Sequence, residues 1–407
     1  QRMNIFAPEA LCEGGKLPRV PIFMPTLAGG YMPAPLAEPG VSFFSPNEKN
    51  SLFRALEHGY VVACPALRGR IRPYGKAPAC IVDYKAAVRF LRHFSDLLPG
   101  DTEKIVTSGT SAGGALSALM GATGNHGDYE EFLSQIGAFE ERDDVFAASC
   151  YCPITNLDNA DMAYEWQFSQ IYEYDSWKMS FENGKPVHTP VHGAMPENRI
   201  KASKELSQLF PEYVNSLDLR GESSLVLDQY GNGSFKDHIK HLVLKSAQAE
   251  MASGRPFERP AWLSENDIDF LEYAKAVTRM KSAPAFDDLA LSSPENNLFG
   301  TEDLHARHFT SYSHDSSESG GELADSLSVR LLNPMGFIGD PGATCAKHWR
   351  IRHGTADRDT SLAISAILDL KLRSSGASVD YHLPWNVPHS GDYDLEELFS
   401  WIDVACQ

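Results

Sequence analysis

The chain has little of three features that would each mark a specialised class of protein: long apolar runs, positive charge and cysteine. Its longest apolar stretches, such as Tyr60 to Leu67, fall well short of the ~18 residues that cross a bilayer. No charged-then-apolar leader opens the chain, so we expect no membrane segment. Lys and Arg number 36 against 54 Asp and Glu. This net charge of −18 repels phosphate backbones and argues against a nucleic-acid partner.

Cysteine is also too sparse for a disulfide framework, and the odd count leaves at least one thiol free. The seven are Cys12, Cys64, Cys80, Cys150, Cys152, Cys345 and Cys406. We expect reduced thiols that fill core space, with a single buried disulfide or a metal site as the alternatives. The Cys150-Tyr-Cys152 pair lacks a second pair at zinc-ligand spacing. No metal and no organic cofactor is predicted.

What the chain does have is the make-up of a globular α/β protein. It contains 407 residues, 43% of them apolar, and short β-rich runs alternate with amphipathic helical stretches. Strands are predicted at 3–6, 20–24, 60–64, 105–107 and 145–150. A capping box at 45–48 predicts a helix that Gly59 closes, and a second helix is expected after Asp83. This alternation predicts a mostly parallel sheet flanked by helices.

A long insertion interrupts that pattern. The next comparable strand, at 349–351, comes nearly two hundred residues later, whereas a crossover between parallel strands needs only about a dozen. The intervening segment carries helical patterns of its own at 235–251 and 268–280. The chain then returns to α/β, with a helix at 361–372, a strand at 379–383 and a helix at about 394–404. We therefore predict a core at 1–154 and 341–407 with an inserted cap, or lid, domain at 155–340.

The strongest chemical signal is the hexapeptide Gly109 to Gly114, which reads G-T-S-A-G-G. It matches G-x-S-x-G directly between a predicted strand and a helix, a context that favours a nucleophile elbow. In that turn the Ser111 hydroxyl projects into a cleft and the Ala112 N–H faces a developing oxyanion. The alternatives are a glycine-rich helix start without chemistry or a phosphate-binding loop, although the latter would carry a lysine beside its last Ser or Thr.

A serine nucleophile needs a base and an acid that orients the base. Asp357 stands just past the strand at 349–351, and His389 lies between the strand at 379–383 and the last helix. The chain order Ser111, Asp357, His389 is that of α/β-hydrolases. Two alternatives stay open: Asp357 could pair with Arg358 or Arg352, and His389 could be a turn residue bonded to backbone.

A second oxyanion donor is expected on a glycine-rich loop after an early strand. Gly29 and Gly30 follow the strand at 20–24, and either can approach a substrate carbonyl because neither has a side chain. An ordinary Gly-Gly turn is the alternative.

Together with these motifs, several longer stretches make the sequence resemble the bacterial tannases (tannin acyl hydrolases), relatives of the feruloyl esterases. The matching stretches are 1–6, 21–25 with 29–33, 109–114, 151–156 with 163–168, 278–281, 293–296, 348–359 and 388–393. They span nearly the whole chain. The cysteines with which fungal tannases are said to tie the serine and histidine loops together are replaced here by Thr110 and Pro388.

The resemblance implies an α/β-hydrolase fold and the same triad of nucleophile, base and acid. It also implies a galloyl clamp of Lys281, Glu295 and Asp359. Phenolic hydroxyls donate to carboxylates, and a lysine ammonium stabilises a phenolate-like oxygen at the same ring edge. Taken without the resemblance, Lys281 and Glu295 are typical solvated charges of the insert.

The expected reaction is hydrolysis of galloyl esters and depsides to gallic acid through an acyl-enzyme on Ser111. A feruloyl or other hydroxycinnamoyl esterase is the alternative within the class, and a catalytically dead hydrolase used as a binding module is the alternative outside it. A small phenolic ester is the expected partner, and a monomer is favoured. The chain begins at Gln1 rather than at an initiator Met, so an upstream piece is expected, and both cytoplasmic and secreted locations stay open.

Overall fold

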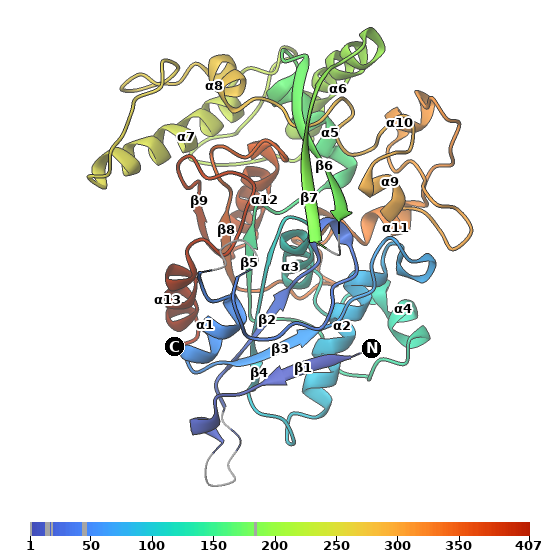
Figure 1. Ribbon diagram of the computed structural model, residues 1–407, viewed down its shortest axis with the longest axis vertical. Helices are drawn as coiled ribbons and strands as arrows, with labels where there is room; N and C mark the ends of the chain where they lie inside the picture. Colours follow the sequence, from blue (N-terminus) through green and yellow to red (C-terminus); the bar gives the residue numbers. More distant parts are fainter. Residues whose placement is uncertain (1, 13–16, 18, 43–46, 183–184) are drawn as a thin grey trace.

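The computed structural model describes residues 2–12, 17, 19–42, 47–182 and 185–407. Its centre is a seven-stranded sheet in the order β1-β3-β2-β4-β5-β8-β9, and Figure 1 labels these strands. The strands are β1 (Met3–Phe6), β2 (Pro21–Thr26), β3 (Val61–Pro65), β4 (Asp101–Thr110), β5 (Ala147–Tyr151), β8 (His348–Arg352) and β9 (Ser378–His382). Only the β1–β3 pair in this sheet is antiparallel. The predicted mostly parallel sheet is therefore confirmed.

Helices cover both faces of this sheet, and successive strand residues alternate between the two. Ile22 and Met24 of β2 pack into one apolar cluster, while Phe23 packs into the other. The first cluster includes α2 (Ala79–His93), α3 (Ala112–Ala122) and α12 (Leu362–Ser374). The second includes α1 (Ser51–Glu57) and α13 (Leu395–Ala405), which lie together in Figure 1. Burial on both faces explains why β3 is a continuous apolar run.

Two predicted helix starts are wrong. Helix α1 begins at Ser51, where the side chain of Asn50 accepts a hydrogen bond from Phe53 N at 2.9 Å and caps the helix. The predicted capping serine at 45 lies outside the described residues. Helix α2 begins at Ala79, four residues before Asp83. The Asp83 carboxylate accepts hydrogen bonds from Arg68, including one from its backbone N–H at 2.8 Å. Asp83 is thus an interior partner rather than a cap.

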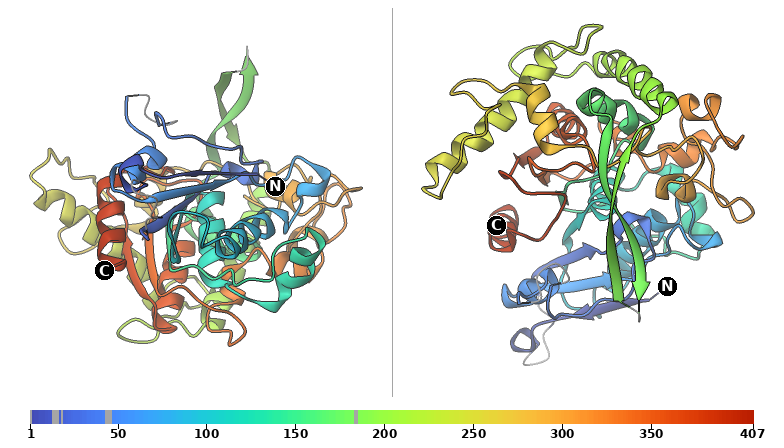
Figure 2. Two further views of the ribbon diagram at one scale, coloured as in Figure 1. Left: turned by 90° about the horizontal axis from the view of Figure 1, so that it is seen from below. Right: turned by 45° about the horizontal axis from the view of Figure 1, so that its top comes forward.

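Within the described residues, no strand of the segment 155–340 joins the central sheet. The segment holds a two-stranded antiparallel hairpin, β6 (Glu173–Glu182) with β7 (Lys185–Ala194), which projects from the molecule in Figure 2. Its helices are α5 (Leu157–Phe168), α6 (Glu197–Ser216), α7 (Ser234–Ala252), α8 (Phe270–Val277), α9 (Pro294–Leu298), α10 (Ser311–Asp315) and α11 (Ser326–Arg330). The remaining helix, α4 (Glu130–Gln135), belongs to the earlier part of the chain. The division at 154 and 340 stays a prediction.

Sequence periodicity missed the hairpin and α6, and it extended α8 too far. That helix ends at Val277, because Thr278 takes a left-handed φ of 65°. The turn directs the next residues toward the sheet, which matters for Lys281. None of the described helices has the length and apolar composition of a membrane span, and all seven cysteines are free thiols.

Candidate active site

Ser111 stands at the sharp turn between β4 and α3. Its φ of 60° and ψ of −122° are rare for a residue with a side chain, and such strain is characteristic of functional sites. The turn is tight enough that a Cβ on Gly109 would lie 2.3 Å from the Gly113 carbonyl oxygen. The backbone N–H of Ser111 donates to Tyr151 O at 3.0 Å, which fixes the turn against β5. The predicted elbow is therefore present as a backbone conformation.

Asp357 and His389 follow β8 and β9, which are neighbours at one edge of the sheet. Their side chains meet, with His389 Nδ1 2.7 Å from Asp357 Oδ2. The other carboxylate oxygen of Asp357 accepts backbone N–H groups from Asp359 at 2.8 Å and Thr360 at 3.2 Å. The histidine is therefore bonded to a side chain rather than to backbone alone.

The alternative ion pairs of Asp357 with arginine are not formed. Arg352 pairs instead with Asp380 at 2.7 Å, and Arg358 donates to the Thr278 hydroxyl at 2.8 Å. A second histidine takes their place, because His353 Nε2 lies 3.2 Å from Asp357 Oδ2 while its Nδ1 lies 2.7 Å from Ser365 Oγ. Sequence reasoning missed His353, although its spacing of four residues before Asp357 in the loop after β8 was a usable signal.

These contacts set the charge states of the pair. Burial alone would raise the pKa of the fully buried Asp357 carboxyl, but His389 and His353 overcome burial and hold that pKa far below its usual range. Burial likewise opposes the charged form of His389, yet the Asp357 carboxylate raises the pKa of His389 well above its ordinary value. Asp357 is thus an anion in the folded protein, and it makes His389 a stronger base.

The histidine loop packs directly on the serine turn. A Cβ on Gly391 would lie 1.8 Å from Thr110 Oγ1, so only glycine permits this approach. Between the two loops lies the thiol of Cys152: its Sγ is 3.9 Å from His389 Nε2, and the Ser111 N–H faces the same sulfur. Among the described residues no hydrogen bond joins Ser111 Oγ to His389. In ligand-free enzyme structures a catalytic contact of this type is often long and tightens only with substrate bound.

The candidate oxyanion loop is the short 3-10 turn Gly29–Tyr31, which packs against α3 and α9. Gly30 has a left-handed φ of 53°, and its carbonyl accepts from Arg70 Nε at 2.7 Å. The N–H of Gly29 already donates to Leu27 O at 3.2 Å, which leaves Gly30 the better donor of the two. Ala112 is the first residue of α3, where backbone N–H groups have no partner inside the helix.

The structure brings the three predicted clamp residues into one partly buried charged cluster. Lys281 Nζ donates to Asp359 Oδ1 at 3.0 Å and lies 4.0 Å from the centre of the Phe286 ring. Glu295 is 5% exposed at the start of α9. Ser293 and Asn296 form the capping box of that helix, so the Glu295 carboxylate is not used as a cap.

Burial and the neighbouring charges shift the pKa values of the three clamp groups in different ways. Burial disfavours the ammonium of Lys281, but the carboxylates of Asp359 and Glu295 outweigh burial and raise the pKa of Lys281. Burial alone would raise the pKa of Asp359, but Lys281 and His389 together hold that pKa below its usual range. Burial dominates at Glu295 and raises its pKa. The cluster therefore offers a cation, an anion and an easily protonated carboxyl.

Tyr164, a fully buried residue of α5, connects the clamp to the triad loop. Its hydroxyl donates to Arg358 O at 2.8 Å and accepts the backbone N–H groups of Met280 at 3.0 Å and Lys281 at 3.3 Å. Arg279 supports the same turn by donating to Lys281 O at 2.7 Å. Sequence reasoning did not assign Tyr164 or Arg279 these contacts.

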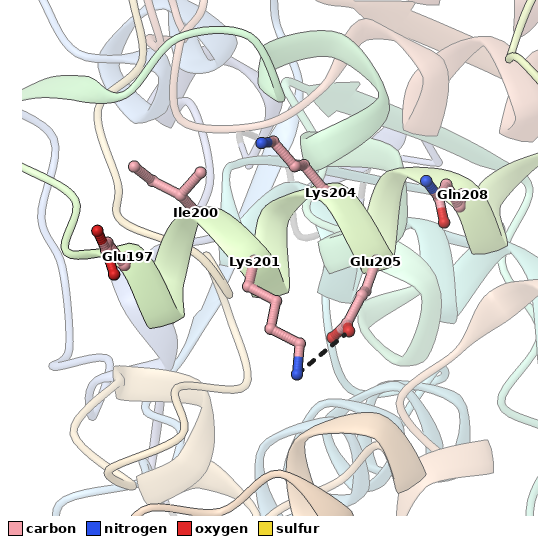
Figure 3. Close-up of a pocket in the computed structure, with 6 residues that line it drawn as sticks. All are labelled: Glu197, Ile200, Lys201, Lys204, Glu205 and Gln208. Atoms are coloured by element: carbon pink, nitrogen blue, oxygen red, sulfur yellow. Dashed lines mark ion pairs between the residues drawn. The ribbon is translucent and has the colours of Figure 1, made fainter.

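A hollow on the outer face of α6 is shown in Figure 3. Its lining is Glu197, Ile200, Lys201, Lys204, Glu205 and Gln208. All six residues belong to one helix, and Lys201 pairs with Glu205 at 3.7 Å. Tyr312 of α10 donates to the Glu205 carboxylate at 2.7 Å, but among the described residues no other element supplies a lining residue, in contrast to the cluster around Asp357. The hollow is therefore a weaker candidate for a ligand site.

Comparisons with known proteins identify relatives of the chain. The BD-FAE family profile matches residues 39–175. Esterase LipC of Mycobacterium tuberculosis (strain ATCC 25618 / H37Rv) is 37% identical over 84 residues, a match that spans 21% of this chain and 20% of that protein.

Solved structures match over the whole chain. A tannase from Lactobacillus plantarum superposes with a TM-score of 0.95 at 43% identity, covering 100% of this chain and 92% of that one. A Fusobacterium nucleatum tannase gives 0.93 at 43% identity, covering 100% and 91%. A tannin acyl hydrolase in complex with ethyl gallate gives 0.92 at 42% identity, covering 100% and 90%. These likenesses confirm the predicted α/β-hydrolase fold with an insert.

Proposed function

Because the chain belongs to the bacterial tannase family and is a carboxylic ester hydrolase, we propose that Ser111, His389 and Asp357 hydrolyse its galloyl ester substrates. The observation that carries the proposal is that Asp357 of the triad and Asp359 of the clamp lie in the same loop after β8. Asp359 donates its N–H to the carboxylate of Asp357 and pairs with Lys281 through its own carboxylate. A phenolic ring held by Asp359 thereby places its ester carbonyl beside the base that Asp357 orients.

The acylation step uses the geometry of the three loops. Neutral His389 takes the proton of Ser111 as its hydroxyl attacks the ester carbonyl. The Asp357 anion at 2.7 Å stabilises the imidazolium that forms. The N–H groups of Ala112 and Gly30 hold the tetrahedral oxyanion. His389 then gives its proton to the departing alcohol, phenol or sugar oxygen.

Deacylation repeats the sequence with water. His389 removes a proton from water, which attacks the galloyl ester of Ser111, and then returns the proton to the serine oxygen. Gallic acid leaves with its carboxyl group at the triad and its hydroxyls at the clamp. Residues 155–340 act as the cap in this proposal, because they supply Lys281 and Glu295 above residues of the core.

Recognition of the ring rests on matched hydroxyl groups. Vicinal phenolic O–H groups donate to the carboxylates of Asp359 and Glu295, and the Lys281 ammonium faces the same ring edge. Complexes of related tannin acyl hydrolases with ethyl gallate and with 3,4-dihydroxybenzoate support a phenolic substrate for this chain.

A comparison of methyl gallate with methyl ferulate tests the proposal against the feruloyl alternative. A methoxyl group in place of a hydroxyl leaves a buried clamp group unpaired, at a cost of about 1–3 kcal/mol. We expect kcat/KM for methyl gallate to exceed that for methyl ferulate by roughly 10- to 100-fold. Equal rates on the two esters would contradict the clamp. Labelling of Ser111 by a fluorophosphonate, absent in Ser111→Ala, would exclude a catalytically dead binding module.

A further inference from the structure

The thiol of Cys152 has no part in the proposed mechanism, yet it lies at the edge of the catalytic histidine. Its Sγ is 3.9 Å from Nε2 of His389. Ligand-type atoms of Cys152, His389 and Asp357 all lie within 4.8 Å of one another. We propose that Cys152 Sγ and His389 Nε2 together bind a thiophilic divalent cation, Zn²⁺ or Cd²⁺, which inhibits the esterase. The inhibition, though not the binding, rests on the proposed function.

The spacing of the two ligand atoms suits such an ion. Tetrahedral zinc lies about 2.3 Å from a thiolate sulfur and about 2.1 Å from an imidazole nitrogen, which puts the two ligands about 3.6 Å apart. The observed separation of 3.9 Å is therefore closed by a movement of a few tenths of an ångström, shared between two side chains.

The sulfur is held in position by its backbone. Cys152 has a left-handed φ of 34°, and its N–H donates to Arg352 O at 2.6 Å. The thiol now donates weakly to Ser390 O at 3.4 Å, a bond that is lost when a metal replaces the thiol proton. Cys150, two residues earlier on β5, faces Ser117 in the core instead, so Cys152 alone of this pair meets the histidine.

The histidine is already oriented as a metal ligand. Metal-binding histidines commonly donate their other ring N–H to a carboxylate, which fixes the tautomer and makes the ligating nitrogen more basic. The 2.7 Å contact of His389 Nδ1 with Asp357 is that arrangement. The Cys152 thiolate and the Asp357 carboxylate together balance the charge of a divalent ion, and Ser111 Oγ or water completes its coordination. The cation then binds the Nε2 lone pair of His389, which otherwise accepts the proton of Ser111.

The test measures inhibition and binding separately. Methyl gallate hydrolysis by the full chain, freed of metal by a chelator, is followed against ZnCl₂, CdCl₂ and MgCl₂. We expect Zn²⁺ and Cd²⁺ to inhibit and Mg²⁺, which prefers oxygen ligands, to leave the rate unchanged. In Cys152→Ala the inhibiting concentration should rise by roughly tenfold or more, because the loss of even an outer partner costs that much. Cys12→Ala, which removes an exposed thiol, is the matched control and should behave as the wild type.

Binding is read from the ultraviolet absorption of a thiolate bound to Cd²⁺. One equivalent of this band should disappear in Cys152→Ala and in His389→Ala, but not in Cys12→Ala. Equal sensitivity of the wild type and Cys152→Ala to Cd²⁺, in both readouts, would overturn the site while leaving the esterase proposal intact. A chain that hydrolyses no gallate ester but loses the band in both variants would overturn the esterase proposal instead. Should Cys152→Ala unfold, as judged by circular dichroism, Cys152→Ser gives the same comparison.

Discussion

The sheet and the insert both bury apolar side chains and charge pairs, but the strand residues of the sheet follow one regular alternation. Strands of the sheet alternate apolar residues between two clusters, as Ile22 and Phe23 do. The insert packs apolar side chains such as Phe210, Phe235 and Phe270, and it also pairs charges that are fully buried. Glu165 and Arg279 are both fully buried and form two hydrogen bonds, one of them 2.7 Å long. Asp287 accepts from the buried His308 at a 2.8 Å separation. Alternation therefore marks the strands of the sheet, whereas the polar pairs of the insert follow no repeated pattern in the sequence.

The proposed site also combines residues from the sheet region with residues from the insert. Ser111, Asp357 and His389 all follow strands of the sheet, where the carboxyl ends of parallel neighbours meet. Lys281 and Glu295 come from the insert, and only Asp359 of the clamp belongs to the triad loop. If the comparison holds, variants of the sheet residues change the rate of bond cleavage on every ester, whereas variants of the insert change the preference among rings.

The largest effect is expected from Asp357→Asn. His389 acts as a base only when neutral, so activity rises with pH through its pKa, which Asp357 raises above the usual ~6.5. Without the carboxylate, the rising limb of kcat/KM should move to lower pH, and the plateau should fall about 10⁴-fold. The loss should be equal for methyl gallate and methyl benzoate. A limb that stays in place, or a loss confined to gallate, would break the assignment.

A smaller and selective effect is expected from Glu295→Gln. The variant keeps the shape of the side chain but removes an anion that faces the ring hydroxyls. We expect kcat/KM for methyl gallate to fall by roughly 10- to 100-fold, equivalent to about 1–3 kcal/mol, and the rate on methyl benzoate to stay unchanged. Glu272→Gln on the exposed face of α8 is the control. Equal losses on both esters would place Glu295 in the general machinery rather than the clamp.

Sequence reasoning located these residues unequally, for physical reasons. The strands that carry the triad were placed within a few residues because β4 has a buried stretch that includes Ile105 and Val106, while β8 and β9 alternate apolar with polar side chains. The elbow was found because its glycines are required by close approach. Lys281 and Glu295 have no pattern of their own and entered only through a family resemblance. His353 was missed although it stands four residues before Asp357, because that spacing gains meaning only from one contact, the 3.2 Å approach of its Nε2 to Asp357.

In the insert, α7 was placed within one residue at each end, but the hairpin and α6 were missed and α8 was extended too far, for a related reason. The turns of the insert are fixed in part by buried polar contacts between residues far apart in sequence. Asp161 illustrates this, since it accepts the backbone N–H groups of Phe286 and Asp287 at 2.7 and 3.0 Å. Burial and the nearby Asp287 raise the pKa of Asp161 to about 8. No local signal in the sequence around Asp161 points to residues more than a hundred positions away.

The smallest effect is expected at the hydroxyl of Tyr164, which links the two regions. Tyr164 belongs to the insert, and its hydroxyl is hydrogen-bonded to the backbones of both Arg358 and Lys281. Tyr164→Phe keeps the ring and removes that link, so the clamp lysine should lose its fixed position while the pair of Asp357 and His389 keeps its own contact. We expect kcat/KM for methyl gallate to fall about fivefold, equivalent to about 1 kcal/mol, with a smaller loss on methyl benzoate.

Tyr213→Phe is the matched control, because its hydroxyl also accepts a hydrogen bond, from Asn156 at 2.5 Å, but touches neither loop. If Tyr164→Phe reduces both esters equally, the hydroxyl supports the triad loop, and the separation of cleavage from ring recognition fails at this residue. If it lowers the melting temperature as Tyr213→Phe does and leaves the ratio of the two esters unchanged, the hydroxyl only stabilises the fold. A selective loss means that α5 sets the distance between clamp and triad, and therefore the length of acyl group that can span them.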